Sequence, residues 1–197
     1  MKNDTLAMLD QAELFQLAVT VSAGGDSATA IAYLKEAVSR ADATAAAHYL
    51  LGAEYAQIRL YDRAMDEMEA AVALDPALWT ARLQLALLYL GANREERAAD
   101  ALRPLAELGD DAALQRFATG LLALIGNDMP GALQALADGI ERNQANPALN
   151  GDMQRIMDEI QRRLDEAPQA AEEGVEEEEG EGADHILLSA YAGNQRH

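Results

Sequence analysis

The chain contains no cysteine among its 197 residues, which excludes disulfide bonds and thiol chemistry. Aromatic residues make up only 5% of a chain that is half hydrophobic and rich in alanine, and this composition favours helix over sheet. No run of 18 apolar residues is present, so the sequence predicts no membrane span. Asp4, Asp10 and Glu13 lie where a signal peptide needs an unbroken apolar core, and we expect a cytoplasmic protein.

Positive charge is scarce. The chain has 15 Lys and Arg residues and 34 Asp and Glu residues, so its formal net charge is −19. Ten of the acidic residues lie in 165–184, which contains no Lys or Arg, and removing these ten charges still leaves a balance of −9. A field of this sign repels nucleic acid and anionic membrane surfaces. We therefore expect no nucleic-acid partner, whereas basic protein partners are compatible with the charge.

Residues with catalytic chemistry are also few. Only three histidines occur; His48 lies within an apolar helical pattern, whereas His185 and His197 lie near the C-terminus. No two histidines are four residues apart, and without cysteine a zinc site is not expected. No glycine-rich phosphate loop is present. The sequence therefore predicts no enzyme, no cofactor and no metal site.

A repeated pattern with a period of 34 residues fills most of the chain. In the segment 45–78 the pattern consists of Leu51-Gly52, Tyr55, Ala64, Met68, Ala71 and Pro76. A shift of 34 residues gives related residues in the neighbouring segments, and the position of Ala64 is occupied in turn by Ala30, Ala98 and Ala132. The pattern resembles the tetratricopeptide repeat, a hairpin of two antiparallel helices.

The resemblance implies an all-α protein, a right-handed superhelical stack of helix-turn-helix hairpins. The expected repeats are about 11–44, 45–78, 79–112 and 113–146. Small residues at corresponding positions of the first helices would let the paired helices approach closely; they are Ala18, Gly52, Ala86 and Gly120. Gly25-Asp26, Asn93 and Asn127-Asp128 fit the turns between helices, where Asp or Asn can cap the helix that follows.

Three residues depart from this pattern. Pro104 falls inside the second helix of the third repeat, where it predicts a kink or an early end. At the position of Ala37 and Ala71 the third repeat has the larger Leu105 and the fourth has Gly139, which predicts a weaker second helix in the fourth.

The C-terminal part divides into a helix and a tail. Apolar residues recur at helical spacing over about 149–165, at Met153, Ile156, Met157, Ile160 and Leu164, and predict a helix that caps the last repeat. We therefore expect one domain over 1–165. Residues 166–197 form an acidic tail, disordered over 166–184, which ends in an apolar segment at 185–191. The apolar side chains of this segment are Ile186, Leu187, Leu188 and Tyr191.

The resemblance further implies that the first helix of each repeat lines a concave groove, where the family usually binds peptides or partner helices. The candidate partner-binding residues are Phe15, Val19, Tyr49, Ala53, Leu83, Leu87, Leu90, Phe117, Leu121 and Leu124. The alternative is that these apolar side chains meet one another as core. The groove lacks the cationic side chains that clamp a C-terminal carboxylate in some members of the family.

These patterns predict a non-enzymatic protein-protein interaction module, or a chaperone-like adaptor, that binds an apolar or amphipathic protein segment in its groove under regulation by its own tail. One alternative is a self-assembling structural subunit that forms homo-oligomers through groove and tail. Another is a secretion-type chaperone for an export substrate, because short acidic proteins with repeats of this kind resemble such chaperones. The C-terminal segment has three candidate receptors: its own groove, that of a neighbouring copy, or another protein.

Overall fold

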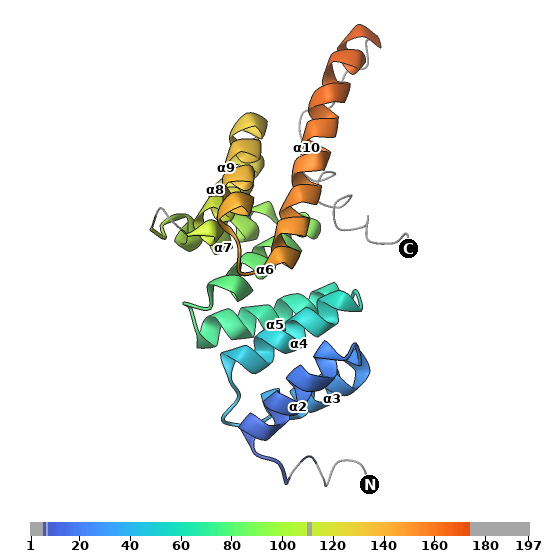
Figure 1. Cartoon of the computed structure of the whole chain (residues 1–197), viewed down its shortest axis with the longest axis vertical. Coiled ribbons are helices and arrows are strands. Elements are labelled where there is room, and N and C mark those ends of the chain that lie inside the picture. Colours follow the sequence, from blue (N-terminus) through green and yellow to red (C-terminus); the bar gives the residue numbers. More distant parts are fainter. Residues whose placement is uncertain (1–5, 7, 110–111, 174–197) are drawn as a thin grey trace. The chain divides into compact units, whose positions relative to one another are not determined.

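The computed structural model describes residue 6 and residues 8–109 and 112–173, with side chains described as far as Glu166. Within these residues the regular elements are α-helices, as the sequence predicts (Figure 1). They are α2 (Gln11–Ala23), α3 (Ser27–Val38), α4 (Ala45–Gln57), α5 (Tyr61–Leu74), α6 (Trp79–Gly91), α7 (Glu95–Ala106), α8 (Ala113–Ile125), α9 (Met129–Arg142) and α10 (Pro147–Glu173). The predicted C-terminal segment 185–191 lies outside the described residues.

The helix starts repeat with the period of the sequence. The first helices of the hairpins begin at Gln11, Ala45, Trp79 and Ala113, each 34 residues after the one before. The second helices begin at Ser27, Tyr61, Glu95 and Met129, again 34 residues apart. The apolar and small residues of the pattern therefore fall at the same point of each hairpin.

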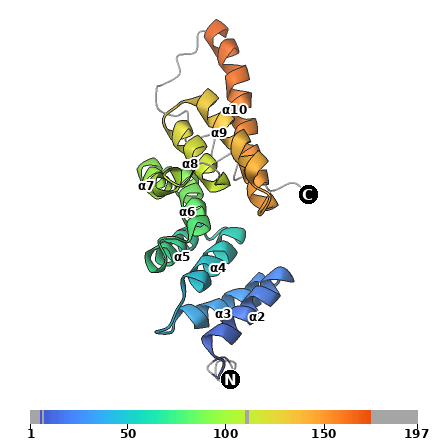
Figure 2. The ribbon, with the colours of Figure 1, turned by 60° about the vertical axis from the view of Figure 1, so that its left-hand side comes forward.

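The chain divides into two compact units, Met1–Leu88 and Tyr89–His197, and the division falls inside α6. The sequence alone predicts a single array over 1–165 and gives no sign of this division. In unit 1, α2 packs on α3, α3 on α4, and α4 on α5 (Figure 2). In unit 2, α7 packs on α8, α8 on α9, and α9 on α10.

Small residues set the distance between paired helices, as predicted. A Cβ atom added at Gly52 of α4 would lie 3.0 Å from Cγ of Met68 in α5. In unit 2 a Cβ atom at Gly120 of α8 would lie 2.8 Å from Cγ of Leu136 in α9. The facing positions of the second helices are fully buried alanines, among them Ala64 and Ala132. Any larger residue at these four positions would push the paired helices apart.

Gly139 has a packing role that the sequence does not reveal. The helix α9 runs through Gly139 to Arg142 without interruption. A Cβ atom at this position would overlap the ring of Phe117, which is fully buried in α8. The glycine lowers the intrinsic helix propensity, but it leaves the space that the phenylalanine ring fills.

Two helix ends differ from the sequence expectation. The helix α7 passes through Pro104 and ends at Ala106, which corresponds to residue 140 one repeat later, whereas α9 continues to Arg142. Relative to α9, the helix α7 therefore ends only two residues early. At the C-terminus α10 continues to Glu173 instead of ending near 165, so the first residues of the predicted disordered tail are helical. An i,i+4 ion pair between Arg162 and Glu166 stabilises the helix where it was expected to end.

The turn inside each hairpin has the same backbone geometry in both units. The residue before the second helix cap has a left-handed conformation, with positive φ, at Gly25, Arg59, Asn93 and Asn127. The next backbone N–H donates to the carbonyl five residues earlier at 2.8–3.0 Å, in the pairs Asp26–Val21, Leu60–Tyr55, Arg94–Tyr89 and Asp128–Ala123. This bonding is that of a Schellman motif, which satisfies carbonyls that the helix end leaves free.

Candidate functional site

Six of the ten predicted partner-binding side chains are buried. They are Leu83, Leu87, Leu90, Phe117, Leu121 and Leu124, each no more than 5% exposed. They belong to α6 and α8, where almost every apolar side chain of the pattern is covered. These residues therefore serve as core, which is the alternative that the sequence left open.

The other four predicted residues remain accessible in unit 1. Val19 is 36% exposed, while Phe15, Tyr49 and Ala53 are partly exposed. Phe15 and Tyr49 are equivalent under the 34-residue period, as are Val19 and Ala53, so the four lie on the same side of their helices. We call this surface the α2/α4 face. It offers two aromatic rings, one branched aliphatic group and one methyl group.

Polar contacts join the first helices of unit 1 beside this face. The side chain of Tyr49 in α4 hydrogen-bonds with Gln84 in α6. Burial raises the pKa of the Tyr49 hydroxyl, and the hydrogen bond from Gln84 partly offsets this shift. Ser22 Oγ of α2 donates to Glu54 Oε1 of α4. Glu54 is only 3% exposed, and its Oε2 atom has no hydrogen-bond partner among the described residues. These contacts hold α2, α4 and α6 in register.

Chemistry-bearing side chains do not converge in the described part of the chain. His48 Nδ1 lies 2.7 Å from Oε2 of Glu67, which places the imidazole in a contact between α4 and α5. No group of three His, Asp or Glu residues among the described residues is arranged to hold a metal ion. No helix in the same part of the chain is long and apolar enough to cross a bilayer.

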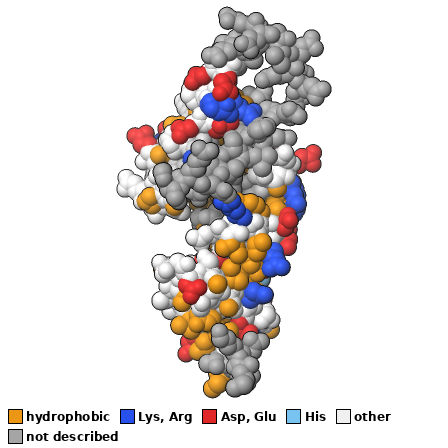
Figure 3. All heavy atoms as spheres, turned by 90° about the vertical axis from the view of Figure 1, so that its right-hand side faces the viewer, with side chains coloured by type: hydrophobic (Ala, Val, Ile, Leu, Met, Phe, Trp, Pro, Cys, Tyr) orange, Lys and Arg blue, Asp and Glu red, His pale blue; other side chains and the backbone are white. Residues whose placement is uncertain are grey.

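A second apolar surface in unit 1 is one that sequence reasoning missed. Hydrophobic side chains gather over the lower part of the view in Figure 3, where the N-terminal hairpins lie. An open hollow of about 600 Å³ follows one side of α2 and is lined by Leu9, Ala12, Glu13, Gln16 and Leu17. We call these five residues the α2 seam. Leu17 occupies a position of the repeat that the next two hairpins bury, at Leu51 and Leu85.

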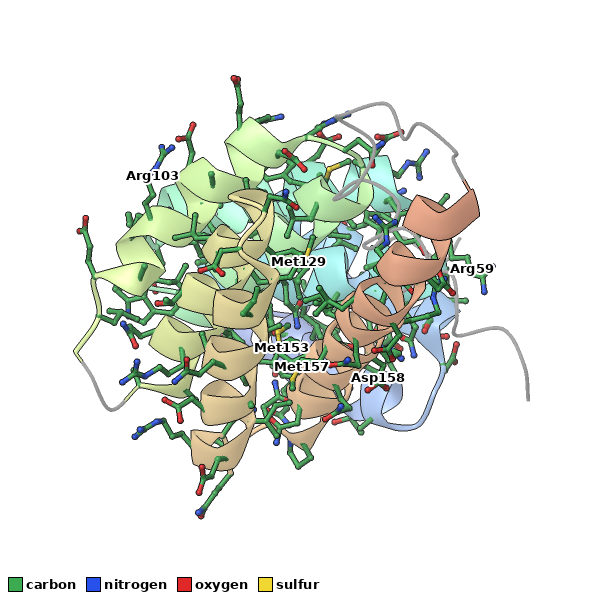
Figure 4. All side chains as sticks on the ribbon, turned by 90° about the horizontal axis from the view of Figure 1, so that it is seen from above. Arg59, Arg103, Met129, Met153, Met157 and Asp158 are labelled. Atoms are coloured by element: carbon green, nitrogen blue, oxygen red, sulfur yellow. The ribbon has the colours of Figure 1, made fainter. Side chains whose placement is uncertain are left out.

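The last hairpin of unit 2, in contrast, is covered. The helix α10 packs on α9, and its Met153, Ile156 and Ile160 are buried, as the predicted capping helix requires. Figure 4 shows Met153 and Met157 of α10 lying towards Met129 of α9, with Asp158 on the other side of the helix. The α2 seam has no equivalent of α10 among the described residues.

Comparison with known proteins agrees with the repeat pattern. Residues 45–78 match the family model for the tetratricopeptide repeat. This segment is α4 and α5 with the connection that follows them, and the chain therefore carries a tetratricopeptide repeat. The hairpins before and after it keep the same helix starts and turn geometry.

Solved structures of MamA have a similar fold. One crystal structure of MamA is 22% identical with a TM-score of 0.57, over 68% of this chain and 78% of that chain. The structure of MamA from residue 41 to its end, from Desulfovibrio magneticus RS-1, is 16% identical with a TM-score of 0.59, over 96% of this chain and 99% of that one. At these identities the likeness concerns the fold. No curated protein matches the chain in sequence.

Proposed function

We propose that this protein is a non-enzymatic interaction module that binds an apolar or amphipathic segment of a partner protein on the α2/α4 face. The observation that carries the proposal is the exposure of Phe15, Val19, Tyr49 and Ala53 at equivalent positions of two adjacent first helices. Apolar surface that repeats along neighbouring helices suits an elongated apolar ligand.

The chemistry of the face favours a particular kind of partner. Aromatic side chains such as Phe15 and Tyr49 provide large contact area at low conformational cost, which is why aromatic residues dominate binding hot spots. The chain has a net charge of −19, so a segment with basic residues beside its apolar ones associates faster than an acidic one. A carboxylate-terminated peptide finds no cationic fork among the four residues of the face.

Capture of partners from a lysate, with a photoreactive amino acid at position 15, tests the proposal. The variants Val19→Glu and Ala53→Glu place a charge on the face without disturbing a buried side chain. We expect each to reduce cross-linked partner at least tenfold, which corresponds to about 1.4 kcal/mol of binding free energy. The reduction follows from burying an unpaired carboxylate in an apolar contact.

The matched control is Ala32→Glu, which places the same charge on an exposed alanine of α3, a second helix. It should leave capture unchanged, and thermal melts of all three variants should coincide with that of the unmodified chain. If the partner survives both Val19→Glu and Ala53→Glu, the α2/α4 face is not the binding surface and the proposed function is wrong.

A further inference from the structure

The turn between α4 and α5 presents a group of exposed apolar side chains. Ile58, Leu60 and Tyr61 lie within four consecutive residues and are 46%, 41% and 36% exposed. The view in Figure 3 faces the end of the hairpins where this turn lies, and it shows hydrophobic side chains bordered by Lys or Arg. We call residues 58–61 the α4/α5 tip. Single apolar side chains are common on protein surfaces, whereas a group of them marks an interaction site.

The 34-residue pattern does not require apolar residues at the tip. In the other three hairpin turns, small or charged residues occupy the positions of Ile58 and Leu60. They are Gly24, Ala92 and Gly126 at the first position, and Asp26, Arg94 and Asp128 at the second. The tip is therefore specific to the second hairpin, and the repeat fold does not explain it.

The tip lacks local features that stabilise the other turns. Asp26 and Asp128 cap the second helices of their hairpins, because each side chain accepts a hydrogen bond from a backbone N–H at 3.0 Å. The Leu60 side chain makes no such cap at the start of α5. Arg59 has a left-handed backbone, with a φ of 63°, where the other turns have glycine or asparagine. Positions that break several local rules together are expected at functional sites.

The charge of the tip is opposite to that of the whole chain. Residues 57–65 contain two arginines and one aspartate, so their net charge is +1, in a chain of net charge −19. The equivalent segments of the other turns have net charges of −1, 0 and −1; they are 23–31, 91–99 and 125–133. The Arg63 guanidinium lies over the ring of Tyr55, with Cζ 5.8 Å from the ring centroid, and this contact orients it. An oriented guanidinium binds a carboxylate through two parallel hydrogen bonds.

We propose that the α4/α5 tip binds a segment of a partner protein that carries Asp or Glu beside its apolar residues. Apolar side chains of this segment cover the tip, and one of its carboxylates pairs with Arg63. An anionic membrane is a poorer occupant, because the net charge of −19 repels it. Two tips of two copies are also poorly matched, because like charges would meet. The inference does not depend on the α2/α4 face, which shares no residue with the tip.

A graft of the first turn onto the second tests the proposal on the full chain. The variant Ile58→Gly/Arg59→Gly/Leu60→Asp gives the α4/α5 turn the residues of 24–26, so it removes the tip and keeps the turn geometry. The graft should melt no lower than the unmodified chain, because it gains a helix cap and loses a left-handed arginine. The matched control introduces the same three residues into the α6/α7 turn, as Ala92→Gly/Asn93→Gly/Arg94→Asp.

The probe is a displayed library of random 16-residue peptides, selected on the unmodified chain after depletion on the graft. We expect the recovered peptides to be enriched in Asp or Glu next to apolar residues. By fluorescence anisotropy, synthetic copies should bind the graft at least ten times more weakly than they bind the α6/α7 control. Arg63→Gln removes one charge and should weaken binding at least threefold, whereas Arg103→Gln, at an exposed arginine of α7, should not. Val19→Glu, which tests the α2/α4 face, should also leave this binding unchanged.

Recovery of no peptide after the depletion would overturn the proposal, and so would recovery of basic peptides. Light scattering tests the second copy as occupant, because a concentration-dependent dimer that the graft loses would assign the tip to self-association. Co-sedimentation with vesicles that contain phosphatidylserine tests the membrane. Sedimentation of the unmodified chain but not of the graft would assign the tip to lipid and would also contradict the proposal.

Discussion

At the scale of single residues, the fifteenth position of each hairpin is the most constrained. Its backbone is left-handed in all four turns, with φ between 54° and 81°. Gly25 adopts this conformation without steric cost, and asparagine tolerates it at positions 93 and 127. Arg59 has neither advantage, and its side chain points to the periphery of the molecule (Figure 4). The second turn therefore contains backbone strain that the other three avoid.

Replacement of Arg59 by asparagine should stabilise the protein. The substitution Arg59→Asn keeps the turn and removes a left-handed penalty, and we expect the free energy of unfolding to rise by roughly 0.5–1 kcal/mol. Urea unfolding followed by circular dichroism measures the change. The reverse substitution, Asn93→Arg, should lower the free energy by a similar amount. If neither change moves the midpoint, backbone strain is not what distinguishes this turn.

The turn residues also show how far sequence reasoning reaches at this scale. Gly25, Asn93 and Asn127 could be placed in turns because their chemistry favours a left-handed backbone. Arg59 could be placed only through the 34-residue period, since nothing in an arginine side chain indicates positive φ. The unpaired oxygen of Glu54 lay beyond prediction, because it depends on what surrounds the carboxylate in three dimensions.

At the scale of helices, stability depends on close approach at a few glycine and alanine positions. Gly120 of α8 lies against the backbone and side chain of Leu136 in α9, and the neighbouring Phe117 fills the space left by Gly139. The pair α8 and α9 therefore interlocks through two glycines, one on each helix. A methyl group at either position must displace a buried neighbour.

A pair of glycine substitutions separates packing from helix propensity. Gly120→Ala should destabilise the protein by about 1–2 kcal/mol, because overpacking exceeds the gain in helix propensity. Gly151→Ala in α10 has no atom within 4 Å of the new Cβ and should stabilise by roughly 0.5–1 kcal/mol. Chemical denaturation of both variants measures whether each substitution lowers or raises the free energy of unfolding. Stabilisation by Gly120→Ala would show that the helices can separate without cost.

The sequence predicts helices better than it predicts their surroundings. Their starts follow from turn residues and the period, so Trp79 and Ala113 could be located in advance. The burial of Leu87 and Phe117 could not, because periodicity assigns a side chain to a face but does not say what covers that face. The acidic composition after residue 165 does not indicate the extension of α10 to Glu173, which i,i+4 ion pairs such as Arg162–Glu166 support.

At the scale of the whole molecule, negative charge is the dominant long-range term. The formal net charge of −19 includes ten acidic residues in 165–184. Exposed ion pairs such as Arg162–Glu166 in α10 offset only a little of this repulsion, because solvent screens them. Self-repulsion therefore destabilises the compact state at low ionic strength.

Added salt should consequently raise the melting temperature. Between 0.05 and 0.5 M sodium chloride the Debye length falls from more than 10 Å to a few Å, so like charges are screened. We expect a rise of about 2–4 °C, which corresponds to roughly 1 kcal/mol for a chain of this size. Differential scanning calorimetry measures it, with equimolar sucrose as a non-ionic control. A fall with salt would mean that attractive ion pairs exceed the net repulsion.

Because every helix start and every left-handed turn recurs after 34 residues, the chain can change length only in whole hairpins. Excision of residues 45–78 would join Thr44 to Trp79 at equivalent points of the pattern, and duplication of the same segment would insert one complete hairpin in register. A deletion or insertion of any other length would rotate the apolar positions that follow it away from the surfaces on which they pack. Unequal recombination between the encoding repeats is thus a direct genetic route to shorter and longer forms of this protein.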